Sequence, residues 1–446
     1  MIQALRNAML LPDLRRKLLY TLLTLVIYRL AAHVPVPGVD QATLERLLAG
    51  TGGASQLFNL MDLLSGGAMA NFSVMANGVY PYITAQIVLQ LLVPIIPKLE
   101  RLSEEGEVGR RKINQWTYYL AIPLGLLQAF GQIRGLNYAS GAAPVLPRFG
   151  FSPPENILPT ISVLVAMTAG MMFAIWLGDL ITEQGIGNGI SLIIFSGIVA
   201  RVPQNMTRIW AQAQVMEGGG AGMGVLMLGI FLIIMAITMF VIVVVQEGER
   251  RIPVQYGKRV RGIKMYAGGS THIPLRVNTA GMIPLIFAQS ILTFPAVAAN
   301  FFVASENAAV SQFAQGVMSL FTPQSVWYGP LLFLAVVGFT YFYTDMMVQQ
   351  QDLPGALKRQ GGFIPGIRPG KKTASYINSV YRRITLVGAV FLGGVAVLPY
   401  IVDLFLKTQV LLITSSGLLI VVGVVLDTMR QLEAQLLMRH YEGFIK

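Results

Sequence analysis

The sequence predicts an all-α, polytopic membrane protein with ten transmembrane helices. The composition is 54% hydrophobic and only 12% charged, and the mean hydropathy is +0.61. Apolar runs of spanning length also recur along the 446 residues. A helix needs about 20 predominantly apolar residues to cross a bilayer, so repeated runs of that length indicate a chain that crosses it many times.

Ten runs have this length. The run at 223–245 is the clearest, whereas three others are interrupted by Gly, Pro or polar residues. The first run follows a basic segment, as in a signal peptide, but it lacks a small-residue cleavage site, so we interpret it as a permanent span. The predicted spans lie near 18–34, 76–96, 116–133, 157–178, 186–203, 223–245, 277–299, 326–345, 384–405 and 408–428.

The distribution of Lys and Arg predicts the orientation. With the N-terminus in the cytoplasm, 26 of the 33 basic residues fall in cytoplasmic segments, as the positive-inside rule requires. This places both termini in the cytoplasm. The two largest cytoplasmic loops, about 247–276 and 347–383, each carry seven basic residues.

Ten spans divide into two sets of five, an N-terminal half at 1–205 and a C-terminal half at 206–446. Because each half has an odd number of spans, the halves run in opposite directions, as in an inverted pair with a path near the midplane. This inference rests on counting, since the residues show no convincing internal repeat.

One segment, LFNLMDLLSGGAMANFSVM at 57–75, is apolar but unable to span. It carries Asn59, Asp62 and Asn71, and Gly66 and Gly67 interrupt it. Such a broken segment is tolerated at membrane depth only where it is buried in protein or lines a cavity. The protein is therefore expected to enclose a cavity that holds this segment.

The chain has few residues that are suited to catalysis. We therefore expect that it is not an enzyme and that it binds neither a cofactor nor a metal ion. It has no cysteine, and its three histidines have no His or Cys partner at metal-ligand spacing. Near 365–373 a phosphate-loop pattern fails, because Pro365 and Lys372 replace the required residues. The predicted spans also lack ionisable residues near their middles, which is evidence against an ion-coupled transporter.

Isoleucines recur four residues apart in two irregular spans, as Ile83 and Ile87 and as Ile190 and Ile194. This spacing places each pair on one helical face, where the side chains face lipid, fill a core or line a path. Polar residues occur in these two spans and in the span at 277–299, which is irregular in a similar way. They favour an interior that is partly hydrated, and they are Gln86, Gln90, Ser191 and Asn278.

The chain resembles the SecY family of protein-translocase channel subunits along nearly its whole length. The matching stretches are PVPGVD at 35–40, LSGG at 64–67, YPYI at 80–83, EGEVGRRK at 105–112, GIGNGIS at 185–191, ERRIPVQY at 249–256, NTAGMIP at 278–284, FIPGIRPG at 363–370 and YEGF at 441–444.

This resemblance implies two five-helix halves around an hourglass pore with an aliphatic ring, an outer plug and a lateral gate between spans 2–3 and 7–8. A hydrophobic ring excludes ions by dewetting. By motif position, the ring would be Ile83, Ile87, Ile190, Ile194, Ile283 and Ile420. The plug, about 61–74, would include Met61, Asp62, Leu63, Leu64, Ser65, Gly66, Gly67 and Phe72. The lateral gate would include Gln86, Gln90, Asn278 and Gln289.

The same resemblance implies a gated channel in the bacterial plasma membrane that translocates secretory proteins and inserts membrane proteins laterally. The implied partners are the small subunits SecE and SecG, the SecA motor ATPase, the ribosome, the secretory precursor with its signal peptide, and membrane lipids. The basic loops would dock the motor or the ribosome through electrostatic attraction, with Arg251, Lys258, Arg259 and Arg368 as the main candidates.

Two other functions remain open from the residues. A secondary transporter for a small solute fits ten spans with broken helices, although the lack of midplane charges is evidence against it. A membrane scaffold or insertase without an aqueous pore is the other alternative.

Overall fold

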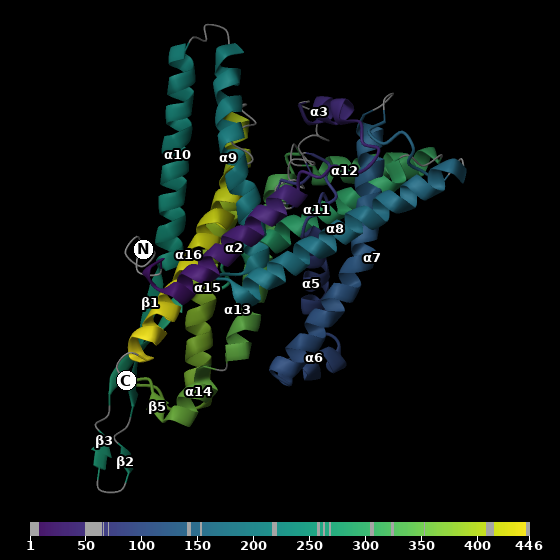
Figure 1. The fold of residues 1–446 in the computed structure, drawn as a ribbon. Helices are drawn as coiled ribbons and strands as arrows, with labels where there is room; N and C mark the ends of the chain where they lie inside the picture. Colours follow the sequence, from purple (N-terminus) through teal and green to yellow (C-terminus); the bar gives the residue numbers. More distant parts are fainter. Residues whose placement is uncertain are drawn as a thin grey trace.

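The computed structural model shows a mainly helical protein (Figure 1). It describes residues 9–49, 65, 67–69, 71–140, 144–151, 154–215, 221–256, 259–261, 264–266, 269–303, 307–322, 325–351, 353–406 and 414–442.

A helix occupies each of the ten stretches that the sequence predicts to span. In chain order these helices are α2 (Pro12–Ala31), α5 (Tyr80–Leu92), α7 (Glu107–Ala139), α8 (Ile157–Gln184), α9 (Gly189–Val215), α10 (Ala221–Glu247), α11 (Ile283–Val303), α13 (Tyr328–Gln351), α15 (Lys371–Leu406) and α16 (Thr414–Glu442). The shorter helices are α3 (Gln41–Ala49), α6 (Pro97–Glu104), the 3-10 turn η1 (Pro154–Asn156), α12 (Ala308–Phe321) and α14 (Leu353–Gln360).

By length and hydropathy alone, four helical stretches of the described chain are able to cross a membrane. They are 154–184, 228–247, 328–360 and 371–398. A fifth candidate, α5 with α6, is bent by 103° at a break that contains Pro94, where a proline cannot continue the backbone hydrogen bonding. The count of ten crossings therefore stays a prediction.

The turn between α8 and α9 shows why the GIGNG motif needs its glycines. A Cβ on Gly189 would lie 1.8 Å from the Gly178 carbonyl oxygen, and Gly187 has φ +96°, which an L side chain rarely adopts. The Gly187 N–H donates to the Gln431 side chain on α16 at 3.0 Å. The motif thus joins the first five helices to the last one.

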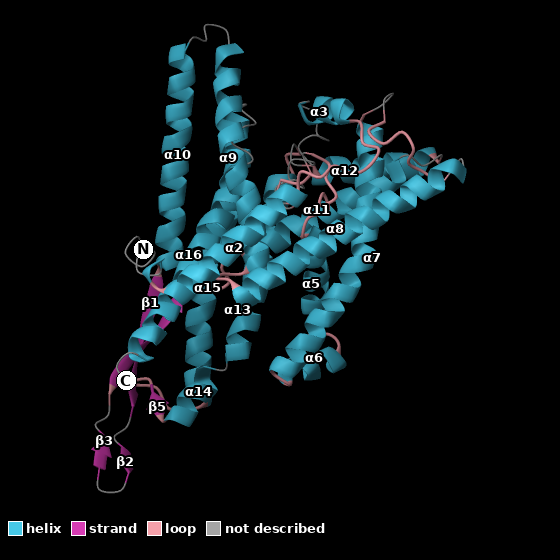
Figure 2. Cartoon of the chain, in the orientation of Figure 1, coloured by secondary structure: helices cyan, strands magenta, loops and turns pink. Residues whose placement is uncertain are grey.

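The largest feature that the sequence analysis missed is a small sheet. Strands β1 (Glu249–Tyr256), β4 (Ser270–Arg276) and β5 (Gly362–Phe363) form an antiparallel sheet in the order β4-β1-β5, and β2 (Arg259–Arg261) pairs with β3 (Lys264–Tyr266). All the strands lie at one end of the molecule (Figure 2). The alternation of Ile252, Val254 and Tyr256 with polar residues is a strand pattern within a stretch that we had interpreted as a basic loop.

This sheet joins the two basic loops. Gln255 of β1 pairs with Phe363 of β5, so the segments near 247–276 and 347–383 form one unit. Ile252, Val254 and Leu275 of the sheet are buried. They pack in one cluster with Leu357 of α14 and Ile377 of α15. Burial of this apolar cluster fixes the sheet against α14 and α15.

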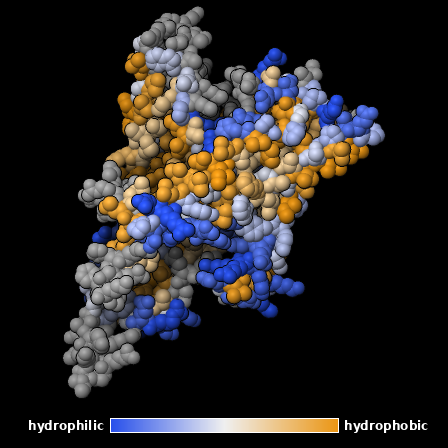
Figure 3. Space-filling view, in the orientation of Figure 1, coloured by the Kyte–Doolittle hydropathy of each residue, from blue (hydrophilic) through white to orange (hydrophobic). Residues whose placement is uncertain are grey.

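The surface separates by polarity. Figure 3 shows a hydrophobic zone over the middle of the visible face, with hydrophilic side chains mainly toward its two ends. Of the four candidate spans, the one in α10 exposes the most apolar surface, because only 11% of its most apolar stretch is buried. Exposed apolar area on this scale favours a lipid environment.

One expected boundary differs from the observed helices. The N-terminal half was expected to end at residue 205, but α9 continues to Val215 and lies beside α10 (Figure 1). A linker between the halves therefore begins later than the apolar run at 186–203 indicates. The division into two inverted halves remains a prediction.

Candidate pore constriction and plug

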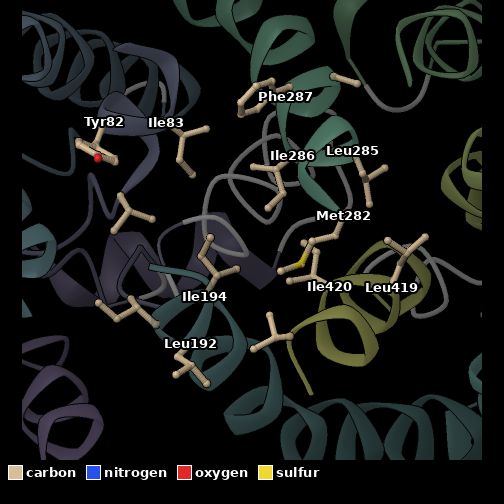
Figure 4. Packing of buried hydrophobic residues seen from close by; sticks show 14 of the residues in the cluster. Tyr82, Ile83, Leu192, Ile194, Met282, Leu285, Ile286, Phe287, Leu419 and Ile420 are labelled. Atoms are coloured by element: carbon tan, nitrogen blue, oxygen red, sulfur yellow. The ribbon is translucent and has the colours of Figure 1, made fainter. Parts of the chain in front are cut away.

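Aliphatic side chains from four helices meet at the centre of the molecule. In Figure 4, Ile83 of α5, Ile194 of α9, Ile286 of α11 and Ile420 of α16 point toward a common centre, with Met282 beside them. All five belong to one buried cluster, and Ile420 is fully buried. Because these helices are far apart in the sequence, the arrangement depends on the whole fold.

The six isoleucines predicted to form the ring all lie in or against this cluster. Ile83, Ile87, Ile194 and Ile420 are buried members, whereas Ile190 and Ile283 are partly buried and pack against it. Ile190 faces α8, since a Cβ on Gly178 would lie 3.1 Å from its Cγ1 atom. The role of the six as a pore ring stays a prediction.

The sequence analysis missed Ile286, which lies three residues after Ile283 on α11. Only 6% of Ile286 is exposed, and its side chain points toward the same centre as Ile194 and Ile420 (Figure 4). The spacing of three residues, which keeps side chains on one helical face, is the signal that could have identified it. The ring residues were assigned by motif position instead, and the motif at 278–284 ends before Ile286.

The predicted plug, about 61–74, is described at residues 65, 67–69 and 71–74. Met61, Asp62, Leu63, Leu64 and Gly66 lie outside the described residues. Ala68 of the plug belongs to the central cluster, and so do Met75 and Val79, which follow the plug in the sequence. Gly67 has φ +87°, which agrees with the predicted break in the segment.

Backbone bonds attach this segment to the chain that follows α2. Pro35 and Ser73 form an isolated antiparallel bridge. The Val36 N–H donates to the Phe72 carbonyl at 3.1 Å, and the Val74 N–H donates to the Val34 carbonyl at 2.9 Å. This strand pair has only a few residues, which limits its stability on its own.

Phe72 anchors the segment in a second buried cluster. Its side chain is fully buried with Met69 and Ala76 of the same segment and with side chains from α7, α8 and α11. Its backbone has φ +39°, a conformation that costs on the order of 1–2 kcal/mol for an L-residue. Burial of an aromatic side chain stabilises by about 1.5–3 kcal/mol, which offsets that strain.

A tyrosine of α2 holds the start of the described plug. The Tyr28 hydroxyl donates to the Ser65 carbonyl oxygen at 2.5 Å, and both groups are buried. The Ser65 hydroxyl accepts from the Met69 N–H at 3.1 Å. Nearby, a Cβ on Gly67 would lie 3.0 Å from the Arg29 guanidinium and 3.7 Å from that of Arg201. The segment therefore has polar attachments as well as apolar packing.

The comparisons with known proteins agree with this arrangement. A family model described as SecY matches residues 73–429. The chain belongs to the SecY family. It is 40% identical to the protein translocase subunit SecY of Streptomyces galbus and 40% identical to that of Halalkalibacterium halodurans, in both cases over the full length of each chain. The resemblance drawn from the sequence motifs is confirmed.

Solved structures share the fold. A protein-conducting channel has a TM-score of 0.62 at 17% identity, with 94% of this chain and 92% of that chain covered. Sec61 in a canine ribosome-channel complex has a TM-score of 0.61 at 17% identity, with the same coverage. The chain thus has the fold of SecY channels, a family of multi-pass membrane proteins.

In this SecY protein, α5 and α11 contact each other across the predicted lateral gate. The Tyr80 hydroxyl on α5 donates to the Ser290 carbonyl oxygen on α11 at 2.7 Å, although the two residues are 210 positions apart in the sequence. The sequence analysis did not identify this bond, because neither residue has a local pattern that reveals its partner.

The four predicted gate residues differ in their surroundings. Gln289 is buried on α11, and within the described residues neither amide atom of its side chain has a hydrogen-bond partner. Gln86 and Gln90 are half-buried on α5. Asn278 instead donates to the Gly281 carbonyl at 3.0 Å, which stabilises the turn before α11. A buried amide without partners costs about 1–3 kcal/mol, so the burial of the Gln289 side chain on α11 is unfavourable.

The predicted docking residues lie on or beside the sheet. Arg251 on β1 is exposed and pairs with Glu249 at 2.7 Å. Arg368 is exposed in the turn before α15, and its carbonyl accepts from the Thr373 hydroxyl at 3.0 Å. Lys258 lies outside the described residues, as does the side chain of Arg259, whose backbone belongs to β2.

Loss of the Tyr28 hydroxyl is expected to loosen the plug. A buried hydrogen bond stabilises by about 1 kcal/mol, so Tyr28→Phe should raise the opening of the segment roughly fivefold. The readout is maleimide labelling of Ala68→Cys, a fully buried position in a chain without native cysteine. Tyr20→Phe, two turns earlier on α2, is the matched control. Equal labelling rates in the two variants would show that Tyr28 does not hold the plug.

Proposed function

We propose that this protein is a gated protein-conducting channel that translocates secretory proteins across the membrane and inserts membrane proteins laterally into it. The observation that carries the proposal is the meeting of aliphatic side chains from α5, α9, α11 and α16. Aliphatic side chains exclude water and ions from a constriction by dewetting. They also part around a chain of any sequence, since they form no specific bonds with it.

The proposed plug supports a gated state. Its described part, within 65–74, is held by Tyr28, by a short strand bridge and by Phe72, all of which are able to break without unfolding a spanning helix. In a solved SecY structure that matches this chain with a TM-score of 0.63, the plug domain stabilizes the closed state of the translocation channel. The fold of this chain supports the same role for its segment.

A lateral exit lies between α5 and α11. One hydrogen bond from Tyr80 and contacts of modest extent join these helices. Separation here would let an apolar segment leave the channel sideways into lipid, which is what insertion of a membrane protein requires.

The proposed setting is the bacterial plasma membrane with both termini in the cytoplasm, because most basic residues then lie inside. SecE and SecG are the proposed small partner subunits, and the SecA motor or the ribosome supplies the driving force. Two matching solved structures are ribosome-bound complexes, which supports the ribosome as a partner of this protein. The other proposed partners are the secretory precursor, its signal peptide and membrane lipids.

The joined basic sheet supports one docking surface. Because β5 pairs with β1, Arg251 and Arg368 belong to a single unit, and Lys258 and Arg259 lie between β1 and β4 in the sequence. A cluster of positive charge attracts RNA phosphates or an acidic protein surface with an affinity that falls with salt.

The proposed function is tested by reconstitution with the small subunits in vesicles. A secretory precursor should become protease-protected only when the motor and ATP are both present. Uptake that is unchanged when the motor and ATP are removed would contradict the proposal. Small-solute exchange without precursor uptake would instead favour a transporter.

Arg368→Glu should weaken docking of the motor, because a repulsive charge replaces an attractive one on an exposed turn. Precursor translocation should fall severalfold, with the loss relieved by a higher motor concentration, while membrane insertion of the variant stays normal. Arg148→Glu, an exposed arginine on the segment before α8, is the matched control. A translocation rate equal to that of the control would remove Arg368 from the docking surface.

A further inference from the structure

A pocket of about 410 Å³ lies between α13 and α15, away from the central ring. Its polar lining comes from one face of each helix. Tyr341 and Asp345 lie one turn apart on α13, and Asn378 and Arg382 lie one turn apart on α15. The rest of the wall consists of Phe342, Thr344, Val348, Tyr381 and Thr385. The volume is within the range of about 300–1,000 Å³ that small-molecule sites have.

The pocket lies where both helices change from apolar to polar. Asp345 ends the predicted span at 326–345, and Arg382 lies two residues before the predicted span at 384–405. Tyrosine and arginine are enriched at this depth, where a membrane meets water. A ligand in the pocket would therefore sit at the level of lipid headgroups.

An apolar track leads from the pocket along α15. Asn378, Arg382, Leu386 and Val390 are spaced four residues apart, so they share one helical face, and all four are exposed. On α13, Leu334 is 66% exposed, and the space beside Gly338 is open. A molecule whose polar head fills the pocket has room for an acyl chain along these residues.

The charged side chains in the pocket determine which lipid headgroup fits it. The Arg382 guanidinium matches a phosphate, to which it donates in a fixed fork geometry. The Asp345 carboxylate accepts hydrogen bonds from an ammonium group, and the Tyr341 hydroxyl and the Asn378 amide add neutral polar contacts. Phosphatidylethanolamine carries a phosphate and a primary ammonium. The quaternary amine of phosphatidylcholine has no N–H to donate, and phosphatidylglycerol has no cation for Asp345.

We propose that the α13–α15 pocket is a headgroup site for a phospholipid with a primary amine, with Arg382 on the phosphate and Asp345 on the ammonium. Bound there, the lipid would connect α15 to α13, which packs directly against the gate helix α11. Basic pockets between spanning helices are known to bind lipid heads, and the added carboxylate is what makes this site selective for an amine.

Native mass spectrometry of the full chain tests this site. The purified protein is exposed to equal amounts of phosphatidylethanolamine, phosphatidylcholine and phosphatidylglycerol, and the retained lipids are counted. Phosphatidylethanolamine should exceed each of the others about tenfold, which corresponds to about 1.4 kcal/mol. Equal retention of phosphatidylcholine, or an excess of phosphatidylglycerol, would overturn the proposal.

Three variants assign the charges. Asp345→Asn should abolish the preference for phosphatidylethanolamine over phosphatidylcholine, and Arg382→Gln should lower retention of all three lipids severalfold. Arg383→Gln, the adjacent exposed arginine outside the pocket lining, should match the wild-type protein. An unchanged preference in Asp345→Asn would overturn the assignment of the amine.

A photoreactive phosphatidylethanolamine gives a test on the wild-type chain, independent of variant folding. With its reactive group near the head, it should crosslink to peptides that contain 341–348 or 378–385. Crosslinks that avoid both peptides would overturn the site.

Discussion

A passage for proteins must be closed to ions and still open to chains of any sequence, and this constraint accounts for the centre of the molecule. A gate lined by polar side chains would bind some segments of a passing chain and repel others. Aliphatic side chains close the passage by excluding water, and they admit a chain by moving apart. Ile83, Ile194, Ile286 and Ile420 come from four helices and belong to one buried cluster, in which they point toward a common centre (Figure 4). The positions of these helices, and hence the seal, depend on the packing of the rest of the fold.

Close packing at glycines places the helices that carry the ring. Gly178 and Gly189 bring α8 and α9 together, and Gly170 lets the Val74 backbone approach α8, where a Cβ would meet its carbonyl oxygen at 2.1 Å. Beside this tight packing, the hydroxyls of Tyr28 and Tyr80 each make one hydrogen bond, the first to the plug and the second across the gate. The molecule thus combines a rigid frame with two polar contacts of about 1 kcal/mol each, to which the plug adds its short strand bridge and the burial of Phe72.

The sequence predicted the features that depend on local pattern. Run length and hydropathy located all ten long helices, and short motifs identified the family. The bonds of Tyr28 and Tyr80 were not predictable, because they join residues 37 and 210 positions apart. The sheet was missed because the charge of 247–276 masked a strand alternation at Ile252 and Val254. Ile286 was missed because the ring was assigned by motif position, and Ile286 lies just beyond the motif at 278–284.

The central claim is that the plug and the aliphatic ring together seal the resting channel. Ion conductance of planar bilayers that contain the chain without residues 63–71 tests it most directly, with the intact chain measured in parallel. The account predicts a higher resting conductance after the deletion, because ions then meet only the ring. An unchanged resting conductance would contradict the claim that this segment closes the channel.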